Sequence, residues 1–298
     1  MHASIPQLIV WALLASSVLA YGTAIAHAGE ADPGVIEVMS ANLRWRVDPE
    51  PNSWELRRER VAKLFGRELP DVVGLQEARR RYVDDLLERL PGYAAYAPGT
   101  DSKNTILFRV DRIALDRETS DAENARVDAP EQSWGEGSIR LPVCARLVLK
   151  AANRGFYLYN NHFDHRSLPS RTWSASVLID RVRARRIDDP VVLTGDFNAR
   201  PGEVTMAFLR GEAALDRDNV SLSNPVAFLD TFAFLHPAKN AAGTYHGFRG
   251  VALGRRIDYI FAGPGFGVLT ARILHDSSRA GHLSDHYPVA ATLWLPQE

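Results

Sequence analysis

The stretch LTGDFN, from Leu193 to Asn198, follows two further apolar residues and is the most informative part of this chain. On an extended backbone, residues two apart share a face, so Asp196 and Asn198 would project on the same side. A carboxylate accepts hydrogen bonds and an amide also donates them, so this pair could hold a water and orient a phosphoryl oxygen. An Asx-type turn after a buried strand is the alternative, and the stretch alone leaves both interpretations open.

Apolar segments of strand length recur along the rest of the chain and predict a layered α/β fold. The predicted strands are Val35 to Ala41, Asp71 to Leu75, Thr105 to Phe108, Cys144 to Leu149, Phe156 to Asn160, Val191 to Leu193, Ile257 to Phe261 and Val289 to Leu295. Helical spacing predicts one helix from Ser53 to Leu69, with Arg57 to Arg60 on its exposed side, and two more around Leu86 and Leu178. Many strands with few helices favour layered sheets with the helices outside them.

Polar residues occur where these predicted strands begin or end. The residues concerned are Asn42, Glu77, His162, Asp196, Asn198 and Asp258, which end or closely follow a strand, and Asp285 and His286, which precede the last one. Strand ends that converge on one rim would gather these side chains into a single pocket. Each residue alone could equally belong to an ordinary surface loop.

Glu77 and His162 have the chemistry that a phosphate ester requires. Mg²⁺ favours one or two carboxylates and leaves its other positions to water and phosphate, so Glu77 is a candidate ligand, with an ordinary helix N-terminal acid as the alternative. His162 lies in the polar run NNHFDH, from Asn160 to His165. We expect His162 to contact phosphate rather than to bind a transition metal with His165, because no third soft ligand has suitable spacing.

The C-terminal motifs RIDY (Arg256 to Tyr259) and SDHYP (Ser284 to Pro288) supply an acid and an acid-histidine pair. A histidine that a buried carboxylate orients and makes more basic can donate a proton or a hydrogen bond to an oxyanion developing on phosphorus. Asp258 and His286 are the candidates for this pair.

Composition indicates one globular domain without disulfide bonds. The chain has 298 residues, 46% of them apolar and 24% charged. The single cysteine, Cys144, excludes an intrachain disulfide and a cysteine-based metal site. With 35 basic and 36 acidic residues the net charge is -1, which gives no support to a dedicated nucleic-acid binder, although an arginine-rich helix face from Arg181 to Arg186 mildly favours a nuclease.

The N-terminus predicts export. No Lys, Arg, Asp or Glu occurs in the first 29 residues, and Leu8 to Ala20 is almost wholly apolar. We expect residues 1–28 to be a signal peptide cleaved near Ala28, which leaves a domain of residues 29–298 in a bacterial periplasm or the medium. The segment from Ile5 to Ala26 is also close to the length of a membrane span, so an uncleaved anchor is the alternative.

Taken in order, six motifs resemble the endonuclease/exonuclease/phosphatase superfamily over roughly Val35 to Leu295: ANLRW, GLQE, NNHFDH, LTGDFNARP, RIDYIF and SDHYPV. The chain is most similar to an exported bacterial branch, which shares Arg171 and the run GTYHGF from Gly243 to Phe248. The resemblance implies a DNase-like, four-layer α/β/β/α fold. Its two-layered β-sandwich is flanked by helices, and the site lies at one edge of the paired sheets.

The resemblance also implies a divalent-metal-dependent hydrolase of phosphoester bonds, a phosphodiesterase or nuclease, with Mg²⁺ or Mn²⁺ as cofactor and in-line attack by an activated water. It implies that Asn42, Glu77 and Asp285 form the metal side of the site, the part that holds the ion. The implied catalytic residues are His162 on the phosphate, Asp196 and Asn198 on the attacking water, and Asp258 with His286 on the transition state.

One departure from the superfamily pattern concerns the metal. Arg44 stands where several nucleases carry an acid two residues after the Asn, which leaves open whether one or two ions bind. The stretch from Gly99 to Asn104 also lacks the Gly-Glu signature of many relatives, so their substrate preferences are not carried over.

The sequence leaves the substrate open among a nucleic acid, a phospholipid headgroup and a smaller ester. The alternatives to a nuclease or phosphodiesterase are a sphingomyelinase-like lipid or small-molecule phosphatase and a non-catalytic binding protein with this fold. We expect a monomer with no obligate protein partner.

Overall fold

The computed structural model describes residues 32–99, 103–125, 142–217, 220–239, 242–250, 254–275, 277–278 and 281–296. The predicted signal peptide, and the membrane anchor that is its alternative, lie outside these residues. Of the helices that the structure describes, none has the length and hydropathy that crossing a membrane requires.

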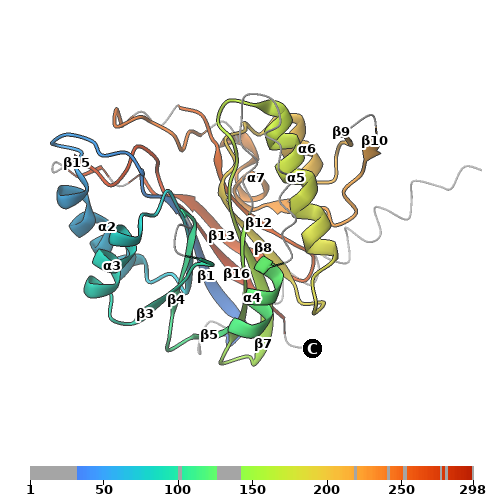
Figure 1. Cartoon of the computed structure of the whole chain (residues 1–298), viewed down its shortest axis with the longest axis horizontal. Coiled ribbons are helices and arrows are strands. Elements are labelled where there is room, and N and C mark those ends of the chain that lie inside the picture. The colour runs from blue at the N-terminus through green and yellow to red at the C-terminus, as the bar shows by residue number, and fades with distance from the viewer. Residues whose placement is uncertain are drawn as a thin grey trace, which may run out of the picture.

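Two six-stranded sheets form the centre of the fold (Figure 1). The first sheet has the order β13 (Gly267–Ile273), β16 (Val289–Trp294), β1 (Val35–Asn42), β2 (Val72–Gln76), β4 (Thr105–Arg109), β3 (Tyr93–Tyr96). The second has the order β11 (Leu229–Asp230), β12 (Asp258–Ala262), β8 (Val191–Asp196), β7 (Arg154–His162), β6 (Val143–Leu149), β5 (Ile113–Asp116). Two short hairpins, β9 (Leu215–Arg217) with β10 (Val220–Leu222) and β14 (Ser277–Ser278) with β15 (Gly281–His282), lie outside the sheets.

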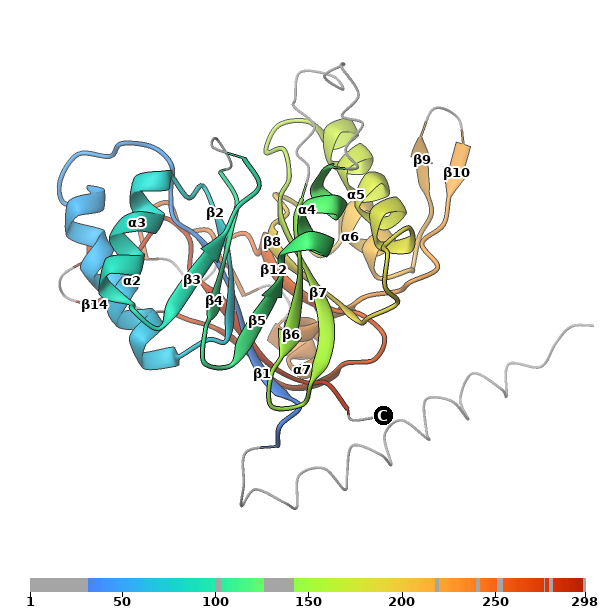
Figure 2. The same cartoon turned by 60° about the horizontal axis from the view of Figure 1, so that its bottom comes forward.

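Helices cover both outer faces of the sandwich, as Figures 1 and 2 show. Against the first sheet pack α2 (Trp54–Glu68) and α3 (Arg80–Arg89), and against the second pack α5 (Leu168–Arg183) and α6 (Val204–Leu209). The remaining helices are α4 (Arg117–Ala125) beside β6, α7 (Thr231–Leu235) beside β12 and β13, and the 3₁₀ turn η1 (Pro237–Lys239). The predicted four-layer α/β/β/α fold is therefore confirmed.

Three apolar clusters hold the four layers together. The cluster between the sheets contains side chains such as Ile106, Leu147 and Phe156, all fully buried. The other two join each sheet to its helices, for example Phe65 of α2 and Leu178 of α5. Because both faces of each sheet are buried, the central strands are almost continuously apolar, as their sequences predict.

A polar network crosses between the sheets just below the edge that carries the candidate site. Gln76 of β2 donates to Asn160 Oδ1 of β7 at 2.6 Å, and Asn160 Nδ2 donates in turn to the carbonyl oxygens of Leu75 and Thr105 at 2.7 and 3.1 Å. A side chain at Gly74 would meet this network, since a Cβ there would lie 2.6 Å from Asn160 Oδ1. These buried hydrogen bonds favour one arrangement of their partners, so they help to set how the two sheets meet.

The exposed position predicted for Arg57 is wrong, because this side chain of α2 is fully buried. Its guanidinium donates to the carbonyl oxygens of Leu43 at 2.9 Å, Leu283 at 2.8 Å and Asn52 at 2.8 Å. Arg57 therefore joins the segment after β1 to the segment before β16, and both of these segments carry candidate site residues.

Candidate active site

Strand direction brings the candidate residues to one edge of the sandwich. The parallel pairs β1–β2 and β7–β8 place Asn42, Glu77, His162 and Asp196 at their carboxyl ends. Antiparallel β12 and β16 begin at the same edge, so Asp258 is the first residue of β12 and His286 lies just before β16. The predicted convergence of strand ends on one rim is therefore what the structure shows.

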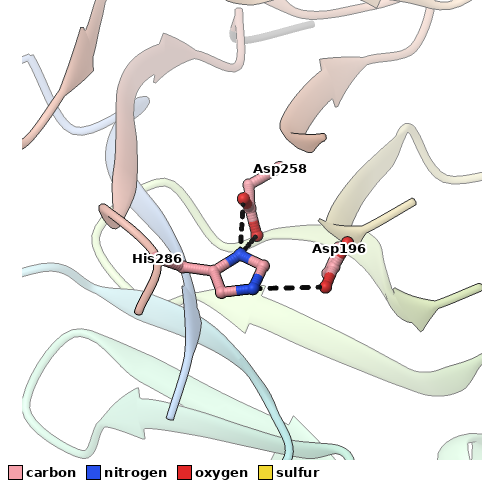
Figure 3. A group of neighbouring side chains, drawn as sticks. All are labelled: Asp196, Asp258 and His286. Atoms are coloured by element: carbon pink, nitrogen blue, oxygen red, sulfur yellow. Dashed lines mark hydrogen bonds and ion pairs between the residues drawn. The ribbon is translucent and has the colours of Figure 1, made fainter. Parts of the chain in front are cut away.

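A buried carboxylate orients the ring of His286 (Figure 3). Its Nδ1 lies 2.9 Å from Asp258 Oδ2 and 3.2 Å from Oδ1, and its Nε2 lies 3.9 Å from Asp196 Oδ2. All three side chains are buried. The imidazole thus has one nitrogen fixed by a carboxylate and the other turned toward Asp196.

Burial and neighbouring charge shift the protonation of this group. Burial alone would lower the pKa of His286, but the carboxylates of Asp258, Asp196 and Asp285 raise it well above its ordinary value. Burial raises the pKa of Asp196 to about 7, and the charges of Asp258 and Glu77 act in the same direction. Near neutral pH, His286 therefore carries a proton while Asp196 exchanges one.

Asn42 connects the two halves of the site. Its Nδ2 donates to Asp196 Oδ2 at 3.1 Å and lies 3.4 Å from Glu77 Oε1, so one amide links carboxylates from the two sheets. Glu77 has a left-handed backbone, with φ of +54°, and its Oε2 accepts from the Trp45 backbone N–H at 2.5 Å. This backbone turn directs the Glu77 carboxylate into the site instead of continuing β2.

His162 and Asn198 lie on the side of the second sheet. His162 Nε2 is 3.7 Å from Asp196 Oδ2 and 3.9 Å from Glu77 Oε1. Of the two interpretations left open for this stretch, the structure has the Asx turn: β8 ends at Asp196, whose Oδ1 accepts from the Asn198 backbone N–H at 3.0 Å, and φ at Asn198 is +49°. Both Asp196 and Asn198 line the cleft.

The predicted metal-side residue Asp285 contacts a cation of the chain itself. Its Oδ2 lies 3.0 Å from Arg44 Nη1, and its Oδ1 accepts from Ser284 Oγ at 3.2 Å. The Arg44 guanidinium also contacts Asp48, through Nε at 3.1 Å and Nη2 at 3.3 Å. Arg44 therefore lies between two carboxylates at the edge of the site.

A cleft of about 440 Å³ opens over these groups. It is lined by Arg44, Glu77, His162, His165, Asp196, Asn198, Tyr245, Arg255, Ile257, Asp285 and His286. Tyr245 and Arg255 were not predicted as site residues, although the GTYHGF run contains the first of them. The Tyr245 ring packs 5.0 Å from that of His286, and its backbone bridges to both His286 and Arg255.

The donor chemistry of the site fits a divalent cation. Among the described residues of the site, four carboxylates (Glu77, Asp196, Asp258, Asp285) lie near the cations Arg44, Arg255 and His286, and the charges of Asp258 and Glu77 contribute to the raised pKa of Asp196. Hard oxygen ligands of this kind suit Mg²⁺ or Mn²⁺. Ligand atoms of Asp196, Asp258 and His286 also lie within 4.8 Å of one another. Because Asp258 already holds His286 Nδ1, Glu77 and Asn42 are the better candidates for binding an ion.

Comparison with known proteins identifies relatives of the whole fold. A model described as the Endonuclease/Exonuclease/phosphatase family matches residues 39–286. An endonuclease/exonuclease/phosphatase from Bacteroides vulgatus is similar in structure, with a TM-score of 0.71, 23% identity and coverage of 88% of this chain and 99% of that one. No curated protein matches the chain in sequence.

Two further solved structures differ in the molecules that their names mention. A mannosyl-6-phosphatase from Bacteroides thetaiotaomicron has a TM-score of 0.68 and 24% identity, with coverage of 87% and 99%. TDP2 from D. rerio, complexed with a single-strand DNA product, has a TM-score of 0.64 and 17% identity, with coverage of 87% and 98%. At these identities the likeness shows a shared fold.

Proposed function

The chain belongs to the endonuclease/exonuclease/phosphatase family of phosphoesterases, and from this premise we propose that it is a divalent-metal-dependent hydrolase of phosphodiester bonds. The observation that carries the proposal is the buried Asp258–His286 pair. The second ring nitrogen of His286, Nε2, lies 3.9 Å from Asp196 Oδ2. Such an arrangement can stabilise charge on a phosphoryl group and accept a proton from water in one confined space.

His286 acts as the cationic donor. Its raised pKa keeps the imidazolium form at neutral pH, and its Nδ1 bond to Asp258 fixes the ring, so Nε2 can donate to a phosphoryl oxygen as that oxygen gains charge. A donor held in place before the reaction costs no reorganisation when the charge develops.

Asp196 acts on the attacking water. A carboxylate whose pKa is about 7 can accept the water's proton as the new O–P bond forms and the ester O–P bond breaks. The Asn198 backbone N–H fixes Asp196 Oδ1 at 3.0 Å, and the Asn42 amide reaches Oδ2 at 3.1 Å. Both carboxylate oxygens are thus oriented before substrate enters, and His162 beside them can contact the phosphate.

Glu77 and Asn42 would hold the metal, whereas Asp285, the third residue predicted on that side, is paired with Arg44 at 3.0 Å. When bound, the ion supplies charge neutralisation at the phosphoryl oxygens. Mg²⁺ and Mn²⁺ both match an oxygen-rich set of this kind. Asn42 would keep its contact with Asp196. The attacking water on Asp196 would therefore have a fixed position relative to the ion.

A small-molecule or lipid-headgroup phosphatase is the second candidate, and the size of the cleft favours it. About 440 Å³ lies within the range of pockets that bind small ligands. Of the arginines from Arg181 to Arg186, Arg183 and Arg186 are exposed, whereas Arg185 donates to Val182 O at 2.7 Å and Asp189 O at 2.9 Å and is less available to a nucleic acid. The two structural relatives do not decide between the candidates, because one is named as a mannosyl-6-phosphatase and the other was solved with a single-strand DNA product.

A substrate panel tests both candidates. We would measure hydrolysis of bis-p-nitrophenyl phosphate, p-nitrophenyl phosphate, plasmid DNA and sphingomyelin in Mg²⁺, Mn²⁺ or EDTA. A diester cleaved faster than the monoester in metal supports the phosphodiesterase, whereas the reverse order supports the phosphatase. No turnover on any of these esters would favour the binding-only alternative.

Export remains part of the proposal and rests on the N-terminal sequence alone. The uncharged, apolar segment before Glu30 supports a signal peptide. Mass spectrometry of the protein produced in a bacterial host would show either a start near residue 29 or the retained segment of an anchored protein.

A further inference from the structure

Arg44 occupies an unusual place for a surface arginine. Its guanidinium bridges Asp48 and Asp285, with Nε 3.1 Å from Asp48 Oδ2 and Nη1 3.0 Å from Asp285 Oδ2. The Asp285 side chain is only 4% exposed, so this ion pair lies partly out of water. Glu77 also contributes an attractive charge to Arg44. The cation therefore lies beside the carboxylates proposed for the metal side.

The backbone fixes this position as well. Arg44 has a left-handed conformation, with φ of +63°, which is uncommon for a residue with a side chain. Its backbone N–H donates to Asn42 Oδ1 at 2.9 Å, and the buried Arg57 holds the preceding carbonyl of Leu43. The strained turn thus directs the guanidinium into the space between the two aspartates.

We propose that the Arg44 guanidinium takes the place of a second metal ion, so that the centre binds a single divalent cation at Glu77. This inference rests on the proposed metal-dependent function. The guanidinium offsets one of the two negative charges and lies between the two carboxylates, so another cation at this place would have to displace it. A planar guanidinium also suits a phosphoryl oxygen: Nε and Nη2 of Arg44 donate to Asp48, and Nη1, which forms the ion pair with Asp285, could also donate to substrate.

Removing the guanidinium would create a cation site. Arg44→Ala removes the cation that lies between Asp48 and Asp285, and leaves Arg57 as the cation on which both still act. The two carboxylates are hard oxygen ligands that Mn²⁺ can then bind. Arg46→Ala is the matched control, because it removes the same charge from an exposed side chain two residues along the chain.

Titration calorimetry of the full-length protein with MnCl₂, together with the EPR signal of free Mn²⁺, counts the bound ions. We expect one bound ion per chain in the parent protein and in the control Arg46→Ala. Arg44→Ala should bind two. Arg44→Gln, which preserves most of the side-chain volume, should also bind two ions and serves if the alanine variant does not fold. Adding Asp48→Asn to Arg44→Gln should return the count to one.

The other outcomes overturn the inference in distinguishable ways. Two ions in the parent protein would show that Arg44 does not replace a metal, and would leave the phosphodiesterase proposal intact. One ion in both Arg44 variants would show that Arg44 only forms a structural ion pair. No bound ion in the parent protein would overturn the metal dependence as well.

Discussion

Asp258 and Asp196 are direct partners in the antiparallel pairing of β12 with β8. Two carboxylates on adjacent buried strand ends repel each other, and His286 lies between them with Nδ1 2.9 Å from Asp258 Oδ2. Their charges raise the pKa of His286, while burial and Asp258 raise that of Asp196 to about 7. The register of two strands therefore sets the protonation states on which the proposed chemistry depends.

We predict a bell-shaped pH dependence of kcat/KM. Activity should rise as Asp196 loses its proton near pH 7 and fall at higher pH, where the imidazolium of His286 loses its own. In Asp258→Asn both pKa values should fall, because the negative charge that raises them is gone, so both limbs move to lower pH. If the two limbs of the pH profile do not move in Asp258→Asn, the roles given to Asp196 and His286 are contradicted. Asp111→Asn, which removes an exposed carboxylate outside the site, is the control.

Gly74→Ala should destabilise the fold by about 1–3 kcal/mol, the usual range for overpacking a dense interior. The added Cβ would lie 2.6 Å from Asn160 Oδ1 and still closer to Thr194 Oγ1, inside the network that joins the sheets. Gly66→Ala is the control: it lies on α2 with no atom within 4 Å of the new Cβ, and should stabilise by about 0.5–1 kcal/mol. Urea denaturation compares the two, and equal stabilities would refute the packing argument.

The sequence predicted the strand ends well because their signal is local. An apolar segment followed by a polar residue identified Asn42, Glu77, His162 and Asp196, and the structure has each at or just after a strand end. Strands β3, β5 and β13 were not predicted. Their segments, such as YAAY and IALD, are short or only half-buried, so burial gives them little periodicity.

Long-range contacts were the part that sequence could not predict. Arg57 is buried because carbonyl groups from two distant segments accept its hydrogen bonds, and helical spacing alone cannot show such partners. The bridge from Arg44 to Asp285 spans most of the chain in the same way. Tyr245 enters the cleft through pairing with Arg255 and His286, in a segment with no strand-like pattern.

Arg57→Ala should lower both stability and activity. It leaves three carbonyl oxygens without their donor, and an unsatisfied buried polar group costs about 1–3 kcal/mol. Because two of these carbonyls flank Arg44 and Asp285, we also expect a lower kcat/KM. Arg80→Ala removes an exposed arginine paired with Asp84, and should change stability by less than about 1 kcal/mol. Chemical denaturation that ranks the two variants equally would refute the structural role of Arg57.

Binding of Mg²⁺ or Mn²⁺ should raise the melting temperature of the parent protein. An ion at one hundred times its Kd stabilises the folded state by about 2.7 kcal/mol. Glu77→Gln should abolish the shift, since the substitution removes the carboxylate that we place on the ion. A shift that persists in Glu77→Gln would locate the ion elsewhere, for instance at Asp196, Asp258 and His286.

The most direct test of the account is the rate of bis-p-nitrophenyl phosphate hydrolysis by the parent protein and by His286→Ala, each in Mn²⁺ and in EDTA. We predict turnover in Mn²⁺ that EDTA abolishes, and a rate about 10²–10⁴-fold lower in His286→Ala, the range for losing a general acid or base. Circular dichroism would establish that the variant is folded. Metal-dependent turnover that survives in folded His286→Ala would contradict the role given to the Asp258–His286 pair.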